Sequence, residues 1–468
     1  MTILVLVATF FAIVVTWSRP RVMVVLALTT VLFVRTAQHL SGIQSIDNVD
    51  DFLTVGVIVR AVQARFFDPA PVGGRRKFPG MIWFVAFAVL GMLGGVIQTE
   101  TQQSTIAAGT FLAMKGVALG WATAQFCWPD FAIRKFVSKA APVVVLVSVL
   151  AIVSFAVPTA WAKVFSVNGG TIDRYGRPSA LGPFIHPFDL AYFSAMAAVA
   201  GITWLTIWGA SKWIVPAVVG GALGTFLSFR RKDLLGLVVA LAIIAMVRKR
   251  WLLLSFFVIF LPVVIILAFD EIAAEFHSLI DAYFAPDSRE ARTVLMAGAV
   301  RLASEYFPLG AGFGRFASRT AAVDYSPEYF RLGMNTVYGL GPGPNQGAFL
   351  TDTSWPAVIG EAGWIGAACF VIGLICIGRA FRGAAQQQRP VSLFLGVTGL
   401  AWLILTVFQS TGSAVFTAPP LYAAFFVLAG IVGSRRSSGD EVLGSLDDFR
   451  LVERPVRRSG ARRASNES

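Results

Sequence analysis

Long apolar runs, separated by short polar segments, recur along most of the chain. A run of about 20 apolar residues matches the thickness of a bilayer as a helix, so each run is predicted to be a membrane span. About 12 spans are predicted: Ile3–Trp17, Val22–Val34, Met81–Ile97, Thr105–Phe126, Ala140–Val157, Asp189–Trp208, Ile214–Leu227, Leu234–Val247, Trp251–Phe269, Trp355–Ile377, Val391–Phe408 and Phe416–Val432. The amphipathic stretch Asp51–Phe67, which Arg60 and Arg65 interrupt, would be a thirteenth.

One long segment, from Asp270 to Asp352, breaks this pattern. A loop of this length is uncommon between spans unless it is functional or disordered, and its many aromatic residues argue against disorder. It is predicted to be a folded, mostly helical external domain. The predicted organisation is N-terminal membrane helices over 1–269, the external loop domain over 270–353, three C-terminal spans over 354–433 and a disordered cytoplasmic tail over 434–468.

Composition supports an all-α polytopic membrane protein. The chain is 56% hydrophobic and 14% charged, whereas soluble proteins carry about 25% charged residues. Its formal charge of +13 resides mostly in arginines between the apolar runs, which orient membrane proteins, so nucleic acid is not an expected partner. The three cysteines, Cys127, Cys369 and Cys376, lie in or beside apolar runs and are expected to pack there. No metal-ligand spacing occurs, so no metal site is predicted.

The basic residues predict an orientation. Arg435 follows the last span and Arg379 lies two spans earlier; the positive-inside rule places both in the cytoplasm and the long loop outside. Two basic groups then fall on the outer side, Arg174 with Arg177 and the run Arg230–Lys232. Cations on the disfavoured side of a membrane are expensive and usually functional, so both groups are candidate site residues.

External arginines near a membrane suit a phosphate or pyrophosphate ligand, because guanidinium stays charged and binds two phosphate oxygens at once. The candidate pyrophosphate-binding residues are Arg177, Arg230, Arg231, Arg292 and Arg315. In the transfer of a lipid-linked glycan, negative charge grows on the departing pyrophosphate, and such arginines would stabilise that transition state.

The acceptor hydroxyl in such a transfer must lose a proton, so a nearby base is needed. The candidate catalytic residues are Asp352, His186 and Glu361. Each has a structural alternative. Asp352 could be the N-cap of the helix that begins near Trp355. His186, before a proline, could only close a loop, and Glu361 could be a buried helix residue paired with an arginine.

Four sequence elements, taken together, resemble the superfamily of O-antigen ligases and O-antigen polymerases, polytopic glycosyltransferases of the GT-C class. The elements are Arg177 with Gly182 and His186-Pro187, the segment Ser228–Leu235, the segment Pro308–Gly314, and Asp352-Thr353 followed by Glu361 and Gly363–Gly366. The chain departs from the family pattern at Asp352, where ligases carry histidine. Related polymerases vary more at this position, which favours a polymerase over a ligase.

The resemblance implies inversion at the anomeric carbon, without a metal or another cofactor. It also implies an undecaprenyl-pyrophosphate-linked oligosaccharide as donor, a glycan or glycolipid as acceptor, and a place in the bacterial cytoplasmic membrane, in surface polysaccharide assembly. The alternative function is a transporter or flippase for a polysaccharide or lipid-linked oligosaccharide. The scarcity of charges within spans and the lack of repeated halves favour the enzyme. A cell-shape-type peptidoglycan polymerase is a third possibility.

Overall fold

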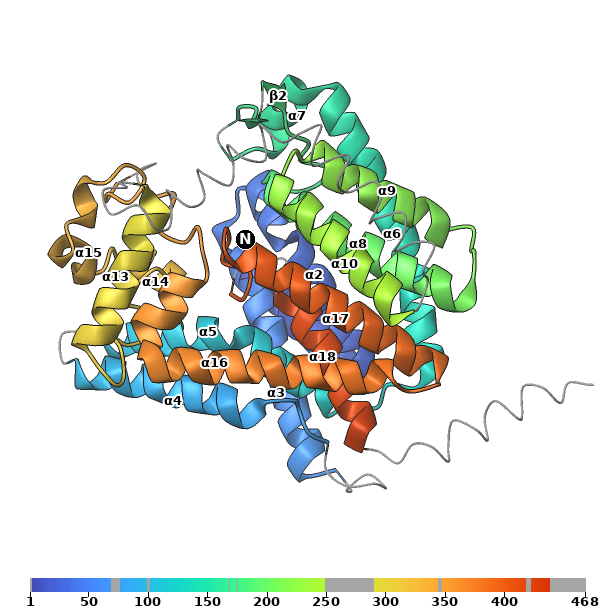
Figure 1. Cartoon of the computed structure of the whole chain (residues 1–468), viewed down its shortest axis with the longest axis horizontal. Coiled ribbons are helices and arrows are strands. Elements are labelled where there is room, and N and C mark those ends of the chain that lie inside the picture. Colours follow the sequence, from blue (N-terminus) through green and yellow to red (C-terminus); the bar gives the residue numbers. More distant parts are fainter. Residues whose placement is uncertain are drawn as a thin grey trace, which may run out of the picture.

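The computed structural model describes residues 2–68, 76–98, 102–167, 169–174, 176–248, 290–343, 347–417 and 422–437, and nearly all its elements are helices (Figure 1). The N-terminal helices are α1 (Thr2–Thr16), α2 (Pro20–Ser41), the 3-10 turn η1 (Gln44–Asn48), α3 (Val49–Phe66), α4 (Met81–Ile97), α5 (Gln103–Ala124), α6 (Asp130–Ala156) and α7 (Pro158–Phe165). The hairpin of β1 (Asp173–Arg174) and β2 (Arg177–Pro178) precedes α8 (Pro187–Trp208), α9 (Ile214–Leu227) and α10 (Arg231–Val247). The remaining elements are α13 (Ala291–Glu305), α14 (Arg319–Val323), α15 (Pro327–Arg331), η2 (Met334–Thr336), α16 (Trp355–Ala385), α17 (Pro390–Ser410) and α18 (Tyr422–Ser437).

Within the described part of the chain, six helices are long and apolar enough to cross a membrane: α2, α5, α6, α8, α16 and α17. Shorter apolar helices lie in α1, α4, α9 and α18. The chain is thus an all-α, multi-pass membrane protein. Each predicted span coincides with a helix, except that Phe416 lies in a turn before α18 and that Trp251–Phe269 lies outside the described residues. The stretch Asp51–Phe67 forms α3, which packs between α2 and α5.

Several helices, α16 among them, are longer than the apolar pattern predicts, and two of the extensions are rich in polar residues. Helix α2 continues seven residues past Val34, to Ser41, and α6 begins at Asp130 rather than Ala140. Both extensions are polar and carry cations, so a count of apolar residues ends too early. The extension of α2 matters for the site, because it places Arg35 on a rigid helix.

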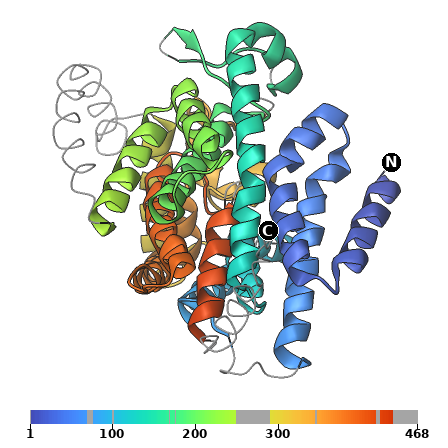
Figure 2. The ribbon, with the colours of Figure 1, turned by 90° about the vertical axis from the view of Figure 1, so that its right-hand side faces the viewer.

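Several of the loops between helices lie close together at one end of the bundle. Arg60 donates to the carbonyl of Trp17 (3.3 Å), Arg76 to that of Gln125 (2.8 Å), and Arg435 to that of Trp128 (3.0 Å). These bonds join loops and helix ends that are far apart in sequence. We call this end, which also carries Arg19 and Lys135, the basic end; helix α6 runs from it to the β1–β2 hairpin at the opposite end (Figure 2).

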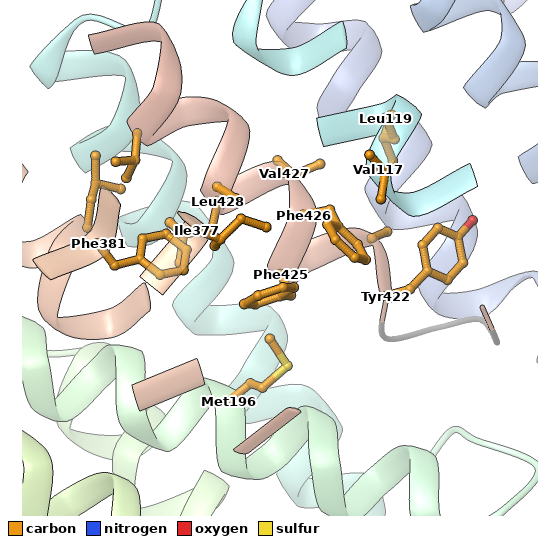
Figure 3. Close-up of a cluster of buried hydrophobic side chains, with 14 of the residues drawn as sticks. Val117, Leu119, Met196, Ile377, Phe381, Tyr422, Phe425, Phe426, Val427 and Leu428 are labelled. Atoms are coloured by element: carbon orange, nitrogen blue, oxygen red, sulfur yellow. The ribbon is translucent and has the colours of Figure 1, made fainter. Parts of the chain in front are cut away.

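The interior of the bundle is a continuous apolar core that reaches from α5 and α18 to α8 and α16 (Figure 3). Close approach depends on glycines: a Cβ on Gly430 would lie 2.2 Å from the carbonyl oxygen of Gly120, and one on Gly116 would lie 2.6 Å from the ring of Phe426. Small residues commonly allow membrane helices to pack at this distance. Helices α5 and α18 are therefore locked together by contacts with no room for larger side chains.

The described part of the long loop, 290–343 and 347–352, has its own apolar core of α13, α14, α15 and η2, and we call it the cap. The cap lies at one end of α4, α5 and α16 (Figure 1). Its Gly310–Gly314 turn is inserted among these helices: Phe313 N donates to Gly91 O (3.1 Å) and Gly312 N to Glu361 O (2.9 Å). Helix α16 kinks where the turn meets it, at Gly363, whose φ is +67°.

Candidate functional site

The C-terminal turn of α17 joins two regions that the sequence separates by more than a hundred residues. The Gln409 side chain donates from Nε2 to Asp233 Oδ1, in the first turn of α10, over 2.5 Å. The next carbonyl, that of Ser410, accepts from Ser354 N (3.0 Å) and from Thr353 Oγ1 (3.2 Å). The starts of α10 and α16 therefore dock on the end of α17, and the predicted segments Ser228–Leu235 and Asp352–Gly366 become neighbours.

Arg230 is buried beside α8 and has partners of its own. Its Nε donates to Asp233 Oδ2 over 3.0 Å, and its guanidinium lies 4.6 Å from the ring centroid of Phe188. Asp233 is fully buried and bonds both Arg230 and Gln409. A buried carboxylate of this kind needs its cation, because an uncompensated charge in the interior is costly. Arg230 thus fixes the geometry of this end of the bundle.

His186 is the N-cap of α8 and carries a defined tautomer. Its Nδ1 accepts from the backbone N of Phe188 over 3.1 Å. The neutral imidazole then carries its proton on Nε2, which can only donate. Burial, together with the charges of Arg230, Arg174 and Arg35, lowers the pKa of His186 below its ordinary value. Its side chain is nevertheless exposed to solvent. We call His186 together with its charged neighbours Arg35, Arg174 and Arg230 the recess.

Arg35 and Asp189 were not predicted as site residues, and both lie beside His186. Asp189 is buried in the first turn of α8, and Arg35 interacts electrostatically with both Asp189 and His186. Thr36 anchors this part of α2, because its hydroxyl donates to the carbonyl of Pro183 over 2.8 Å. Within the described part of the chain, the Arg35 side chain has no hydrogen bond and no ion pair. It is the arginine of this recess that is most available to a ligand.

Asp352 lies at the junction of the cap and α16, paired with Arg292 of α13. Arg292 Nη2 and Nε contact the same atom, Asp352 Oδ2, over 2.5 and 2.6 Å. No hydrogen bond from the described residues reaches Oδ1, and the carboxylate side chain is 26% exposed. The N-cap of α16 is Ser354, so Asp352 does not have the capping position that was its structural alternative. Its carboxylate is held by one oxygen, with the other available.

Glu361 and Arg315 belong to a different network, inside the cap. Glu361 Oε1 accepts from Phe316 N (3.0 Å) and Ser318 Oγ (2.7 Å), and Arg315 Nη2 donates to Glu328 Oε1 (2.7 Å). Glu361, Arg315 and Glu328 are buried. Glu361 is thus bonded to the loop backbone rather than paired with an arginine. These two candidates hold the cap together on α16.

Arg177 and Arg231 are the two remaining predicted arginines. Arg177 is exposed on β2, whereas its strand partner Arg174 interacts electrostatically with His186 and Asp233. Arg231 begins α10, and its side chain lies outside the described residues. In the described ranges, no group of three His, Cys, Asp or Glu side chains could hold a metal ion. The recess therefore presents donors and cations from α2, the hairpin, α8 and α10.

No protein-family model matches this chain, and no curated protein is detectably similar to it. What the site can do follows from its groups. Arg35, Arg174 and the Nε2–H of His186 can donate to an anion, and phosphate oxygens are the ligand that such a set suits best. The Asp352 carboxylate, joined to this recess through the α17 turn, can accept a proton.

Proposed function

We propose that the protein is a glycosyltransferase that moves a lipid-pyrophosphate-linked glycan onto a sugar hydroxyl, in surface polysaccharide assembly. In this proposal about 12 spans cross a bacterial cytoplasmic membrane, with the cap outside and the C-terminus in the cytoplasm. The observation that carries it is the docking of two predicted segments on the end of α17: Gln409 bonds Asp233, next to Arg230, and the Ser410 carbonyl accepts from Thr353 and Ser354, the residues that follow Asp352. The departure at Asp352 favours a polymerase over a ligase.

The pyrophosphate of the donor binds in the recess. Arg35 and Arg174 supply charge, and the Nε2–H of His186 supplies a directed hydrogen bond. The negative charge on the pyrophosphate grows as its bond to the anomeric carbon breaks, so these donors stabilise the transition state more than the bound donor. Arg230, with Asp233 and Phe188, holds α8 and α10 in the required geometry.

The acceptor hydroxyl is activated by Asp352. Arg292 holds Oδ2, and Oδ1 accepts the proton as the acceptor oxygen forms its bond to the anomeric carbon. The donor's carbon–oxygen bond breaks on the opposite face, and undecaprenyl pyrophosphate leaves. A single displacement of this kind inverts the anomeric configuration, as the family resemblance implies. His186 is a hydrogen-bond donor in this scheme and not the alternative base, because its acceptor nitrogen is occupied by Phe188 N.

The test is transfer by the purified protein in detergent, given a synthetic undecaprenyl-pyrophosphate oligosaccharide without nucleotide or added metal. Release of undecaprenyl pyrophosphate with a ladder of lengthening glycans establishes a polymerase. A single product on an added acceptor indicates a ligase. Movement of intact donor across a liposome bilayer, without release, would support the transporter and refute the proposal.

A further inference from the structure

A long apolar groove lies away from the candidate site, between α2, α6, α8, α17 and α18. Its volume is about 1070 Å³, and its walls are almost wholly apolar. On α2 the lining begins at Arg19 and ends at Phe33; on α6 it runs from Phe131 to Val144. Small residues such as Ala200 and Gly201 of α8 form part of the wall and leave the groove wide.

The groove has a strongly cationic mouth at the basic end. Arg19 and Arg21, where α2 begins, and Lys135 and Lys139, on the first turns of α6, all line it and are exposed. None of the described residues that line it is Asp or Glu. Asp130, one turn before Lys135 on α6, forms an ion pair with Arg435 over 2.6 Å. The mouth therefore carries an uncompensated positive charge above an apolar interior.

The groove is long enough for the acyl chains of one leaflet of a bilayer. From Arg19 to Phe33, α2 rises about 20 Å at 1.5 Å per residue, whereas one half of the hydrocarbon core is about 15 Å thick. With the cations at the level of one leaflet's headgroups, the apolar walls therefore cover the full length of that leaflet's acyl chains. The lining on α2 ends at Phe33, before Arg35, and the groove includes none of Arg35, Arg174, His186 or Asp189, so the groove and the candidate site share no residue.

We propose that this groove binds one anionic glycerophospholipid of the surrounding bilayer, with its phosphate group among Arg19, Arg21, Lys135 and Lys139 and its acyl chains along α2 and α6. Apolar contacts give little preference within a membrane, because neighbouring lipid tails are equally apolar. The preference comes from the headgroup, since basic pockets between membrane helices recognise anionic lipids. This binding site is independent of the proposed transfer reaction.

The experiment is native mass spectrometry of the full-length protein in detergent, titrated with phosphatidylglycerol or with phosphatidylcholine that has the same acyl chains. The wild type should bind one phosphatidylglycerol at least 10-fold more tightly than phosphatidylcholine. Neutralising all four cations, as Arg19→Gln, Arg21→Gln, Lys135→Gln and Lys139→Gln together, should weaken phosphatidylglycerol binding by about 30-fold or more. Phosphatidylcholine binding should not change.

The matched control is Lys212→Gln with Arg382→Gln, two exposed cations at helix ends that do not line the groove. It should bind phosphatidylglycerol as the wild type does. A second variant, Ala200→Trp, should fill the groove and weaken both lipids, with folding checked by gel filtration. Equal wild-type affinity for the two lipids, or undiminished phosphatidylglycerol binding by the four-residue variant, would overturn the proposal.

Discussion

Arg35 and Arg230 both interact electrostatically with His186, yet neutralising each of them should have a different effect. Arg35→Gln removes a half-buried cation that makes no hydrogen bond or ion pair with the described residues, although it interacts electrostatically with the buried Asp189. Stability should therefore fall less than when a hydrogen-bonded ion pair is broken, while transfer should lose one charged hydrogen bond to the pyrophosphate. A hydrogen bond to a charged group contributes about 1.5–3 kcal/mol, which corresponds to a loss of about 10- to 150-fold in transfer rate at limiting donor.

Arg230→Gln should mainly destabilise the fold. It removes the 3.0 Å partner of the fully buried Asp233, whose other carboxylate oxygen accepts from Gln409. Removing one partner from a buried ion pair costs about 3–5 kcal/mol. The double variant Arg230→Gln, Asp233→Asn removes both charges and should recover much of that stability.

The assays are release of undecaprenyl pyrophosphate at limiting donor, and thermal unfolding in detergent. Transfer by Arg35→Gln at the wild-type rate would remove Arg35 from the pyrophosphate site. An unfolding temperature of Arg230→Gln equal to that of the wild type would show that the Arg230–Asp233 pair does not stabilise this end of the bundle.

Variants at three further residues separate the remaining roles. Asp352→Asn should lower transfer by about 10²- to 10⁴-fold through loss of the base, with unchanged donor binding in an equilibrium assay; near-normal turnover would exclude that role. His186→Gln keeps a hydrogen-bond donor for the pyrophosphate and should retain most of the transfer activity. His186→Leu lacks that hydrogen-bond donor and should lose most of the activity. The pKa of His186 is lowered in the folded protein, so protonation of His186 favours the unfolded state. The stability that the neutral imidazole provides is complete above about pH 6.5 and is lost as the pH falls toward the folded pKa. The unfolding temperature of the wild type should therefore fall more below about pH 6.5 than that of His186→Gln. Glu361→Ala leaves the buried N–H of Phe316 without its acceptor and should lower the free energy of unfolding by about 1–3 kcal/mol. Glu361→Gln should lower it less.

The apolar pattern predicted membrane-spanning helices because their signal depends on local composition. It did not predict Arg35, because the apolar run ends at Val34 and a helix that continues into polar residues looks like a loop in sequence. It also did not predict Gln409, since a lone amide at the end of an apolar run acquires meaning only when α10 is packed beside it. Conversely, Glu361 and Arg315 have the charge of site residues, and only their buried partners show that they support the cap.

The kink of α16 at Gly363 has a consequence for depth in the membrane. The part of α16 after the kink is 22 residues long, about 33 Å at 1.5 Å per residue, and it reaches across the hydrocarbon core when Arg379 and Arg382 near its end extend their side chains to the headgroups. The part before it, from Trp355 to Ala362, is then free to lie at the level of the headgroups, where the cap's glycine turn rests on it. Glu361 would then lie under the cap instead of facing lipid. An accessibility scan with spin labels along α16 should therefore show lipid exposure at the outward positions after Gly363, beginning with Trp364 and Ile365, and protection from lipid before it.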